Sequence, residues 1–286
     1  MLFRSPRKGA SFIDFIESLP HIEAANNLRA VVDAIVRARD NDRPVIWGMG
    51  AHVIKCGLNP VLIELMRRRV ITAVVLNGAG AVHDFEVALI GETSEDVAAG
   101  LDDGSFGMVR ETADGLNAAL GPVLEDTPDA GFGGLVGRYL NTHGAPNLAH
   151  SLMAQAANLE IPLTVHVAIG TDICHMHPSA DGAAIGRATF NDFRLLATLL
   201  SDLSGGVFLN VGSAVIIPET FLKAFTVAQN LGASLNDFVT VNMDMIAHYR
   251  PGQNVVIRPP QVGGSGYNLL GRHELMVPLL AQAVAE

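Results

Sequence analysis

The segment Val45–His52 reads VIWGMGAH, an apolar β-branched run that passes directly into a glycine-containing turn. Continuous apolar runs of this kind are typical of strands that are buried on both faces of a sheet. Gly48 and Gly50 permit a tight turn into the stretch that follows, and they would let a pyrophosphate approach the amides of a helix. The segment therefore predicts a strand, a turn and a helix of an α/β fold.

This turn matches the glycine fingerprint of dinucleotide-binding proteins only in part. Val53 occupies the third glycine position, and Arg67–Arg69 stand where an acidic ribose ligand is expected. The glycines could serve a cofactor or only the turn itself, and both interpretations stay open. The arginines could bind the 2′-phosphate of NADP or complement a helix end, so NAD and NADP are both candidates.

Apolar runs and amphipathic stretches alternate along the rest of the chain. Further strands are predicted at Ile71–Leu76, Leu163–Ala168, Val207–Val211, Phe238–Asn242 and Val255–Arg258. Helices are predicted at Asn27–Arg39, Asn59–Arg69, Arg194–Leu203, Glu219–Leu231 and Glu274–Val284. This order predicts a mostly parallel sheet with helices on both faces.

No linker, repeat or low-complexity tract divides the chain. We therefore expect residues 1–286 to form a single α/β nucleotide-binding domain with an N-terminal helical segment at 1–43. Residues 101–144 are rich in glycine and aspartate and break the alternation. They predict an inserted lid or a contact between subunits.

The composition limits the classes of function. Of 286 residues 49% are hydrophobic and 17% are charged, and the net charge of −10 would repel a nucleic-acid backbone. The longest apolar stretch, Val207–Pro218, is shorter than the roughly 18–20 residues of a membrane span. The two cysteines and the absence of an apolar signal region favour a reducing compartment. We expect a cytoplasmic protein that binds neither nucleic acid nor membranes.

An imidazole and two carboxylates follow the second predicted strand. The segment Asn77–Glu86 reads NGAGAVHDFE, so small residues that admit a ligand come just before His83 and Asp84. A neutral histidine beside an ionised aspartate could act as a general base near neutral pH. Both residues could instead cap the next helix. Ligands of open α/β sheets bind at strand ends, which favours the catalytic interpretation.

The densest polar cluster follows the third predicted strand, where Gly170–Pro178 reads GTDICHMHP. His175 and His177 could share a metal ion if this segment is extended, with Asp172 or Cys174 as a third ligand. No CxxC or HExxH motif supplies a ready geometry. A metal site, a catalytic role and histidines satisfied by the backbone of a loop all stay open.

Two later strand ends complete this pattern. Gly212 and Ser213 follow the run Val207–Val211, and Asn242 and Asp244 end the next run. Such side chains are good ligands for ribose and amide groups, although turns favour the same residues.

In their order and spacing these segments resemble the deoxyhypusine synthase family from about Pro44 to the C-terminus. The resemblance is carried by Trp47–Leu58, Asn77–Asp84, Ala168–Asp172, Leu209–Ser213 and Arg250–Pro251. It implies a Rossmann-like three-layer fold, NAD at the strand ends and a homotetramer of paired dimers. The cofactor contacts that we expect from the turns and the resemblance together are Gly48, Gly50, Ala51, His52, Asn77, Gly78, Ala79, Gly80, Asp172, Gly212, Ser213, Asn242 and Asp244.

The chain departs from this family at the reacting lysine. The family passes an aminobutyl group through a lysine near the C-terminus, whereas Val255–Pro260 contains none. The only lysines are Lys8, Lys55 and Lys223. Because an imine cannot form on arginine or proline, we expect no aminobutyl transfer.

We therefore predict an NAD-dependent enzyme that oxidises a small polar substrate by hydride transfer. Its predicted catalytic residues are His83, Asp84, His175 and His177, and no metal is assigned. One alternative is a metal-assisted hydrolase or lyase that uses His83, Asp172, His175 and His177. The other is a non-catalytic dinucleotide-binding protein.

Overall fold

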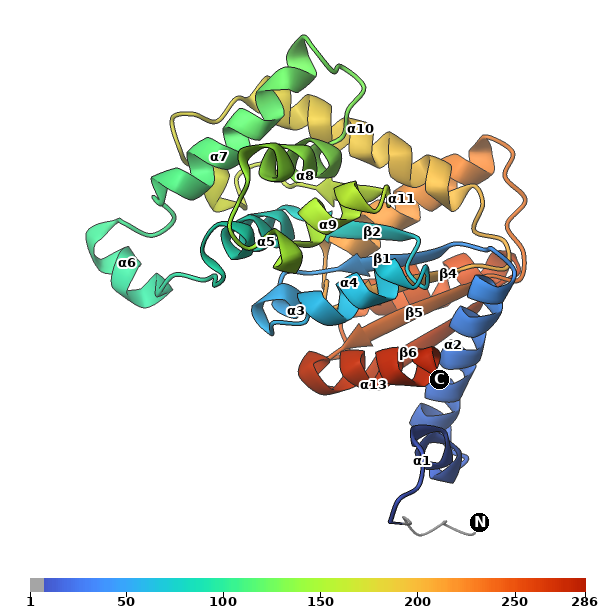
Figure 1. Ribbon diagram of the computed structural model, residues 1–286. Coiled ribbons are helices and arrows are strands. Elements are labelled where there is room, and N and C mark those ends of the chain that lie inside the picture. Colours follow the sequence, from blue (N-terminus) through green and yellow to red (C-terminus); the bar gives the residue numbers. More distant parts are fainter. Residues whose placement is uncertain (1–7) are drawn as a thin grey trace.

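Six parallel strands form one sheet in the part of the chain that the structure describes, residues 8–286 of a computed structural model (Figure 1). The strands are β1 (Val45–Met49), β2 (Ala73–Asn77), β3 (Leu163–His166), β4 (Val207–Val211), β5 (Val239–Asp244) and β6 (Ser265–Leu270). They lie in the order β3-β2-β1-β4-β5-β6, the doubly wound order in which the chain changes direction between β1 and β4. The predicted Rossmann-like α/β fold is confirmed.

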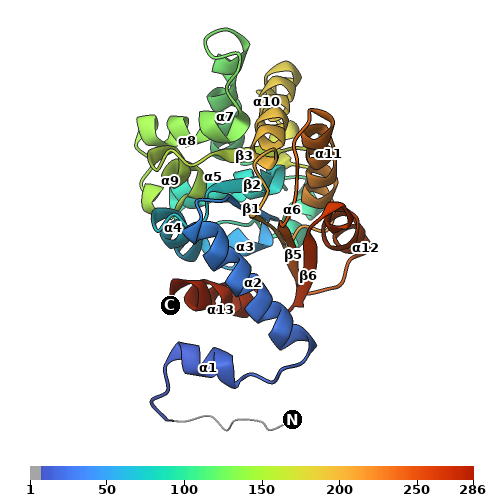
Figure 2. The ribbon, with the colours of Figure 1, turned by 90° about the vertical axis from the view of Figure 1, so that its right-hand side faces the viewer.

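Helices cover both faces of the sheet (Figure 2). The α-helices are α1 (Phe12–Ser18), α2 (Glu23–Asp40), α3 (His52–Lys55), α4 (Asn59–Arg67), α5 (Gly78–Ile90), α6 (Val97–Asp103), α7 (Arg110–Leu120), α8 (Phe132–His143), α9 (Leu152–Asn158), α10 (Gly182–Leu200), α11 (Ile216–Asn230), α12 (Tyr249–Pro251) and α13 (His273–Ala285). The short 3-10 helices are η1 (Gly121–Leu124), η2 (Leu148–His150), η3 (Ile173–His175) and η5 (Pro259–Val262), and η4 (Gly252–Ile257) is a π-helix.

Two apolar cores lie on the two faces because side chains alternate along each strand. Trp47 and Leu209 belong to the larger core, with residues of α2, α4, α5 and α13. Ile46 and Phe208 point the other way and pack against α11 and the end of α10. Every residue of β1 is buried, as its continuous apolar sequence predicts.

One predicted strand is wrong. Val255–Arg258 lies in and after the π-helix η4 and not in a strand, and the sixth strand is Ser265–Leu270. A short apolar run reads alike in a buried helix and in a buried strand, and Val255 is fully buried. The sixth strand was not predicted because its sequence, SGYNLL, is not a continuous apolar run and includes Gly266. The glycine lets η4 pack against the strand, since a Cβ at Gly266 would lie 1.9 Å from the Val256 carbonyl oxygen.

The two irregular regions are helical. The described residues of the predicted N-terminal segment form α1 and α2, whereas residues 1–7 of that prediction lie outside the described part. Residues 101–144 form the end of α6, then α7, η1 and α8. Figure 1 shows α7 and α8 at the opposite end of the molecule from α1. Within residues 8–286, no helix combines the length and the apolar character needed to span a membrane.

Candidate functional site

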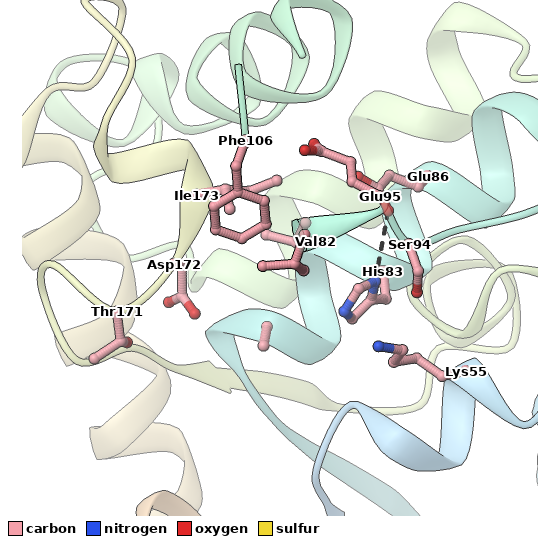
Figure 3. A pocket seen from close by; sticks show the side chains of 12 residues that line it. Lys55, Val82, His83, Glu86, Ser94, Glu95, Phe106, Thr171, Asp172 and Ile173 are labelled. Atoms are coloured by element: carbon pink, nitrogen blue, oxygen red, sulfur yellow. Dashed lines mark ion pairs between the residues drawn. The ribbon is translucent and has the colours of Figure 1, made fainter. Parts of the chain in front are cut away.

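A cavity of about 210 Å³ opens where the carboxyl ends of β1, β2 and β3 meet the turns that follow them (Figure 3). Its polar walls are Lys55, His83, Glu86, Ser94, Glu95, Thr171 and Asp172. Its apolar walls are Ala79, Val82, Val97, Phe106 and Ile173. The volume is below the roughly 300–1,000 Å³ of sites for drug-sized ligands, so the cavity suits a small molecule.

His83 is held in one orientation by a polar cluster on the cavity wall. His83 and Glu86 lie on the same face of α5, three residues apart, and the Nδ1 atom of His83 is 2.6 Å from the Thr93 hydroxyl. That hydroxyl donates its single hydrogen to Glu86, so towards His83 it can only accept. The Nδ1 atom of His83 therefore carries the proton. Nε2 is then the basic nitrogen of the neutral ring.

Glu86 stays ionised in this cluster. Burial alone would raise the pKa of Glu86, but hydrogen bonds from His83 and Thr93 outweigh it and hold the pKa below its usual range. The Oε2 atom of Glu86 is 3.5 Å from the Nδ1 atom of His83. A carboxylate in this position orients the imidazole and stabilises the imidazolium that forms when Nε2 takes a proton.

Asp172 lines the same cavity, and one oxygen of its carboxylate is unsatisfied. The residue is 6% exposed, and its Oδ2 atom is buried without a hydrogen-bond partner among residues 8–286. Burial raises the pKa of Asp172 to about 6. The carboxylate packs against the start of α5, where a Cβ on Gly78 would lie 1.8 Å from Oδ2. The glycine is therefore needed for this approach.

Glu95 and Lys55 add two further charges. The Glu95 carboxylate accepts a hydrogen bond from the Gly107 amide at 2.7 Å, while its Oε1 atom is buried without a partner in the described chain. Lys55 comes from α3 on the other side, and Figure 3 shows its amino group directed toward the ring of His83. The cavity thus combines one cation with acceptors that a donor-bearing ligand would satisfy.

Asp84, a predicted catalytic residue, points away from the cavity. It is completely buried, and its carboxylate accepts hydrogen bonds from Asn59, Ser151 and the amides of Leu152 and Met153 at 2.7–2.9 Å. Burial raises the pKa of Asp84 to about 6 in spite of these bonds. The two amides belong to the first turn of α9, whose amides lack partners within the helix, so the geometry of Asp84 is that of a structural cap.

His175 and His177, also predicted as catalytic, do not line the cavity. The Nδ1 atom of His175 accepts a hydrogen bond from the Gly170 amide at 3.1 Å, and its Nε2 atom is buried without a partner among the described residues. His177 lies 2.8 Å from the Ser179 hydroxyl and 3.3 Å from the Asp114 carboxylate on α7. Among residues 8–286, His83, Asp172, His175 and His177 do not converge to metal-binding distances.

The predicted cofactor glycines at β1 and β4 have packing roles in the structure. A Cβ on Gly48 would lie 2.8 Å from Ile217, and one on Gly50 would lie 2.3 Å from the Gly212 carbonyl oxygen. Gly212 has a φ of +66° and sits against the buried ring of His273. These glycines bring backbone segments together, which is the turn-only interpretation of the sequence motif.

The remaining predicted cofactor residues divide between the cavity and the rest of the sheet edge. Ala79 lines the cavity, and the Asn77 side chain accepts from the Gly80 amide at 2.9 Å to cap α5. The Asn242 side chain accepts a hydrogen bond from the Nδ2 atom of Asn210 and donates one to the Oδ1 atom of Asn268, both at 2.8 Å, on the neighbouring strands. The others are placed as follows: Ser213 accepts from the Ile217 amide, Asp244 accepts from the Met245 amide, and Ala51 and His52 begin α3.

The chain was compared with family models, curated proteins and solved structures. No family model and no curated protein matches the chain. A protein from Entamoeba histolytica described as a deoxyhypusine synthase is 12% identical with a TM-score of 0.55, covering 97% of this chain and 94% of that one. The chain has the deoxyhypusine synthase-like fold. The resemblance predicted from the sequence is thereby confirmed for the fold.

Other solved structures are similar to this chain in fold at similarly low identity. A conserved LOR/SDH protein from Methanococcus maripaludis S2 is 15% identical with a TM-score of 0.54, covering 93% of this chain and 70% of that one. AgrE in ternary complex with ornithine and NAD+ is 16% identical with a TM-score of 0.59, covering 93% of this chain. This chain spans 34% of the length of AgrE.

Several residues that line the cavity or contact His83 were not among the predicted site residues. Lys55 could have been found, because it follows the glycine turn of the first strand and is one of three lysines in the chain. Thr93 and Glu95 carry no comparable signal, since they lie between α5 and α6 and reach the site only through the fold of that loop. In this deoxyhypusine synthase-like fold, Lys55 is the lysine that lines the cavity.

Proposed function

We propose that the protein is an NAD-dependent enzyme that oxidises a small polar substrate by hydride transfer. The observation that carries this proposal is the orientation of His83 by Thr93 and Glu86, with its basic Nε2 atom left for a ligand in a cavity at the carboxyl edge of a Rossmann-ordered sheet. Such an edge is where ligands of open α/β sheets bind.

His83 acts as the general base in this proposal. Its Nε2 atom takes the proton of a substrate hydroxyl or amine, and the Glu86 carboxylate stabilises the resulting positive charge. Lys55 supports an anionic group of the substrate. The unpartnered oxygen of Glu95 accepts a hydrogen bond from one of its donor groups.

NAD would supply the hydride acceptor for this oxidation. The buried Oδ2 atom of Asp172 lacks a donor in the described chain, which fits a ribose hydroxyl group of a cofactor that enters the cavity of about 210 Å³ only in part. Ala79, in the first turn of α5, lines the cavity beside it. The packing roles of Gly48 and Gly50 make them weaker candidates as cofactor contacts than Asp172 and Ala79.

Isothermal titration with NAD and with NADP at millimolar concentration tests cofactor binding. We expect heat with one of the two and a large loss in Asp172→Ala, whereas an exposed control, Asp126→Ala, should bind as the wild type does. Absence of heat from both cofactors would contradict the proposal.

Cofactor reduction with candidate alcohols, amines and amino acids tests catalysis. Replacing His83 by Gln should lower kcat by about 10²–10⁴-fold, the usual contribution of a general base. The matched control is His21→Gln, which changes an exposed histidine between α1 and α2. Cofactor binding without any reduction would instead identify a non-catalytic dinucleotide-binding protein. The predicted homotetramer is checked by light scattering of the purified chain.

A further inference from the structure

A second cluster of reactive side chains lies outside the cavity, where α3 meets the start of α13 (Figure 1). It consists of His52, Cys56 and Glu274, and one ligand atom from each lies within 4.8 Å of the other two. None of the three lines the cavity at His83. The cluster is therefore a separate feature of this sheet edge.

The local chain geometry brings these three groups together. His52 and Cys56 are four residues apart at the two ends of α3, which places them on one face of a helical turn. Glu274 comes from a distant part of the chain and lies in the first turn of α13. Its carboxylate lies at the surface beside the thiol of the half-buried Cys56 and the imidazole of the exposed His52.

We propose that His52, Cys56 and Glu274 bind one Zn²⁺ ion. The Nε2 atom of His52 is 3.4 Å from the Sγ atom of Cys56. Two ligands of a tetrahedral zinc ion are about 3.6 Å apart when the Zn–N and Zn–S bonds have their usual lengths. The pair therefore needs little movement to bind a metal ion.

The chemistry of the three ligands selects the metal. A thiolate and an imidazole suit Zn²⁺, and disfavour Mg²⁺ and Ca²⁺, which prefer oxygen ligands. With Cys56 and Glu274 ionised and His52 neutral, the two ligand charges balance those of the ion. Three protein ligands leave a fourth position for water.

A bound ion would fasten the C-terminal helix to the first strand-turn-helix unit. His52 and Cys56 follow β1, an inner strand, whereas Glu274 follows β6 at one edge of the sheet. Binding to the folded chain alone stabilises it, because the unfolded chain lacks the assembled site. This gives His52 a role different from the cofactor contact expected from the sequence.

A metal titration tests the proposal on full-length protein purified without a metal-affinity tag. The protein is first treated with a chelator, and Zn²⁺ is then added. We expect elemental analysis to find one Zn²⁺ per chain and the Tm to rise. With Co²⁺ as a probe, we expect thiolate-to-cobalt charge-transfer absorption. Cys56→Ser should abolish that absorption, and Glu274→Gln should weaken Zn²⁺ binding by at least about 10–100-fold.

The matched control is Cys174→Ser, which changes the other cysteine, buried in η3, and should keep full binding. Asp172→Asn serves as a second control, because it would disturb a metal site in the cavity but not this one. Absence of Zn²⁺ from the wild type would overturn the proposal. Equal Zn²⁺ content in Cys56→Ser and the wild type, or metal lost only in Asp172→Asn, would overturn it as well.

Discussion

Replacing Asp172 by Asn should make the protein more stable and less able to bind its ligand. The carboxylate is buried beside Gly78 with its Oδ2 atom unpartnered among the described residues, so ionising it is unfavourable in the folded chain without a ligand. Asn has nearly the same shape and carries no charge. A residue that lowers stability in a cavity is expected when its role is to bind a ligand.

The magnitude follows from the shift in pKa. Burial raises the pKa of Asp172 from 3.8 to about 6, a difference of about 2 units at about 1.4 kcal/mol each. Since the folded pKa lies above the unfolded one, the folded chain binds more protons, and stability is lost as the pH rises from about 4 to about 6. The variant should therefore gain up to roughly 3 kcal/mol above pH 6 and almost nothing below pH 4.

Denaturant unfolding of both proteins at pH 4, 6 and 8 measures this difference. Other buried carboxyl groups, such as Asp192, contribute equally to both chains and cancel in the comparison. Asp126→Asn, at an exposed position, should change stability by less than about 0.5 kcal/mol. If Asn at position 172 is destabilising at pH 8, or if its effect does not depend on pH, Oδ2 has a partner in solution and the reasoning is refuted.

Three more substitutions separate structural from functional roles. Asp84→Ala should lower the free energy of unfolding by roughly 2–5 kcal/mol, because two amides of α9 lose their acceptor; lost activity with unchanged unfolding would make Asp84 catalytic after all. Lys55→Met should raise KM by about 10–100-fold and leave Tm almost unchanged. The control, Lys223→Met, should leave KM unchanged, and steady-state kinetics measure the difference. Gly50→Ala should destabilise by roughly 1–3 kcal/mol, because its methyl group would meet the Gly212 carbonyl oxygen, and equal Tm values would argue against that packing role.

Most of the fold could be predicted from the sequence because each buried strand is a short, continuous apolar run that can be recognised without knowing its neighbours. Five of the six predicted strands overlap observed ones, since runs such as Val207–Val211 remain apolar whichever way they are paired. The strand prediction at Val255–Arg258 was wrong because a short apolar run has the same composition in a buried helix and in a buried strand. The strand β6 was not predicted because its sequence contains Gly266. The structure explains this glycine by the packing of η4 against it.

The site could be predicted only in part, because neighbours in sequence need not share a direction in space. His83 and Asp84 are consecutive, yet successive residues of a helix point about 100° apart. One therefore faces the cavity and the other faces α9. Likewise, Asp172 enters the cavity, while His177, five residues later, pairs with Asp114 on α7. The three-dimensional partners of His83 come from its own helix face and from a later loop.

That loop couples the shape of the cavity to the state of its base. Thr93 fixes the Nδ1 proton of His83, and only two residues later Glu95 lines the cavity, followed by Phe106 on the same stretch. The helix α6 lies between Glu95 and Phe106 and has no buried residues, so the segment from Thr93 to Phe106 is held mainly at its two ends. The stretch that walls the cavity therefore also carries the hydroxyl group that makes Nε2 the basic nitrogen, and in the proposed reaction we expect proton transfer to require this stretch in place.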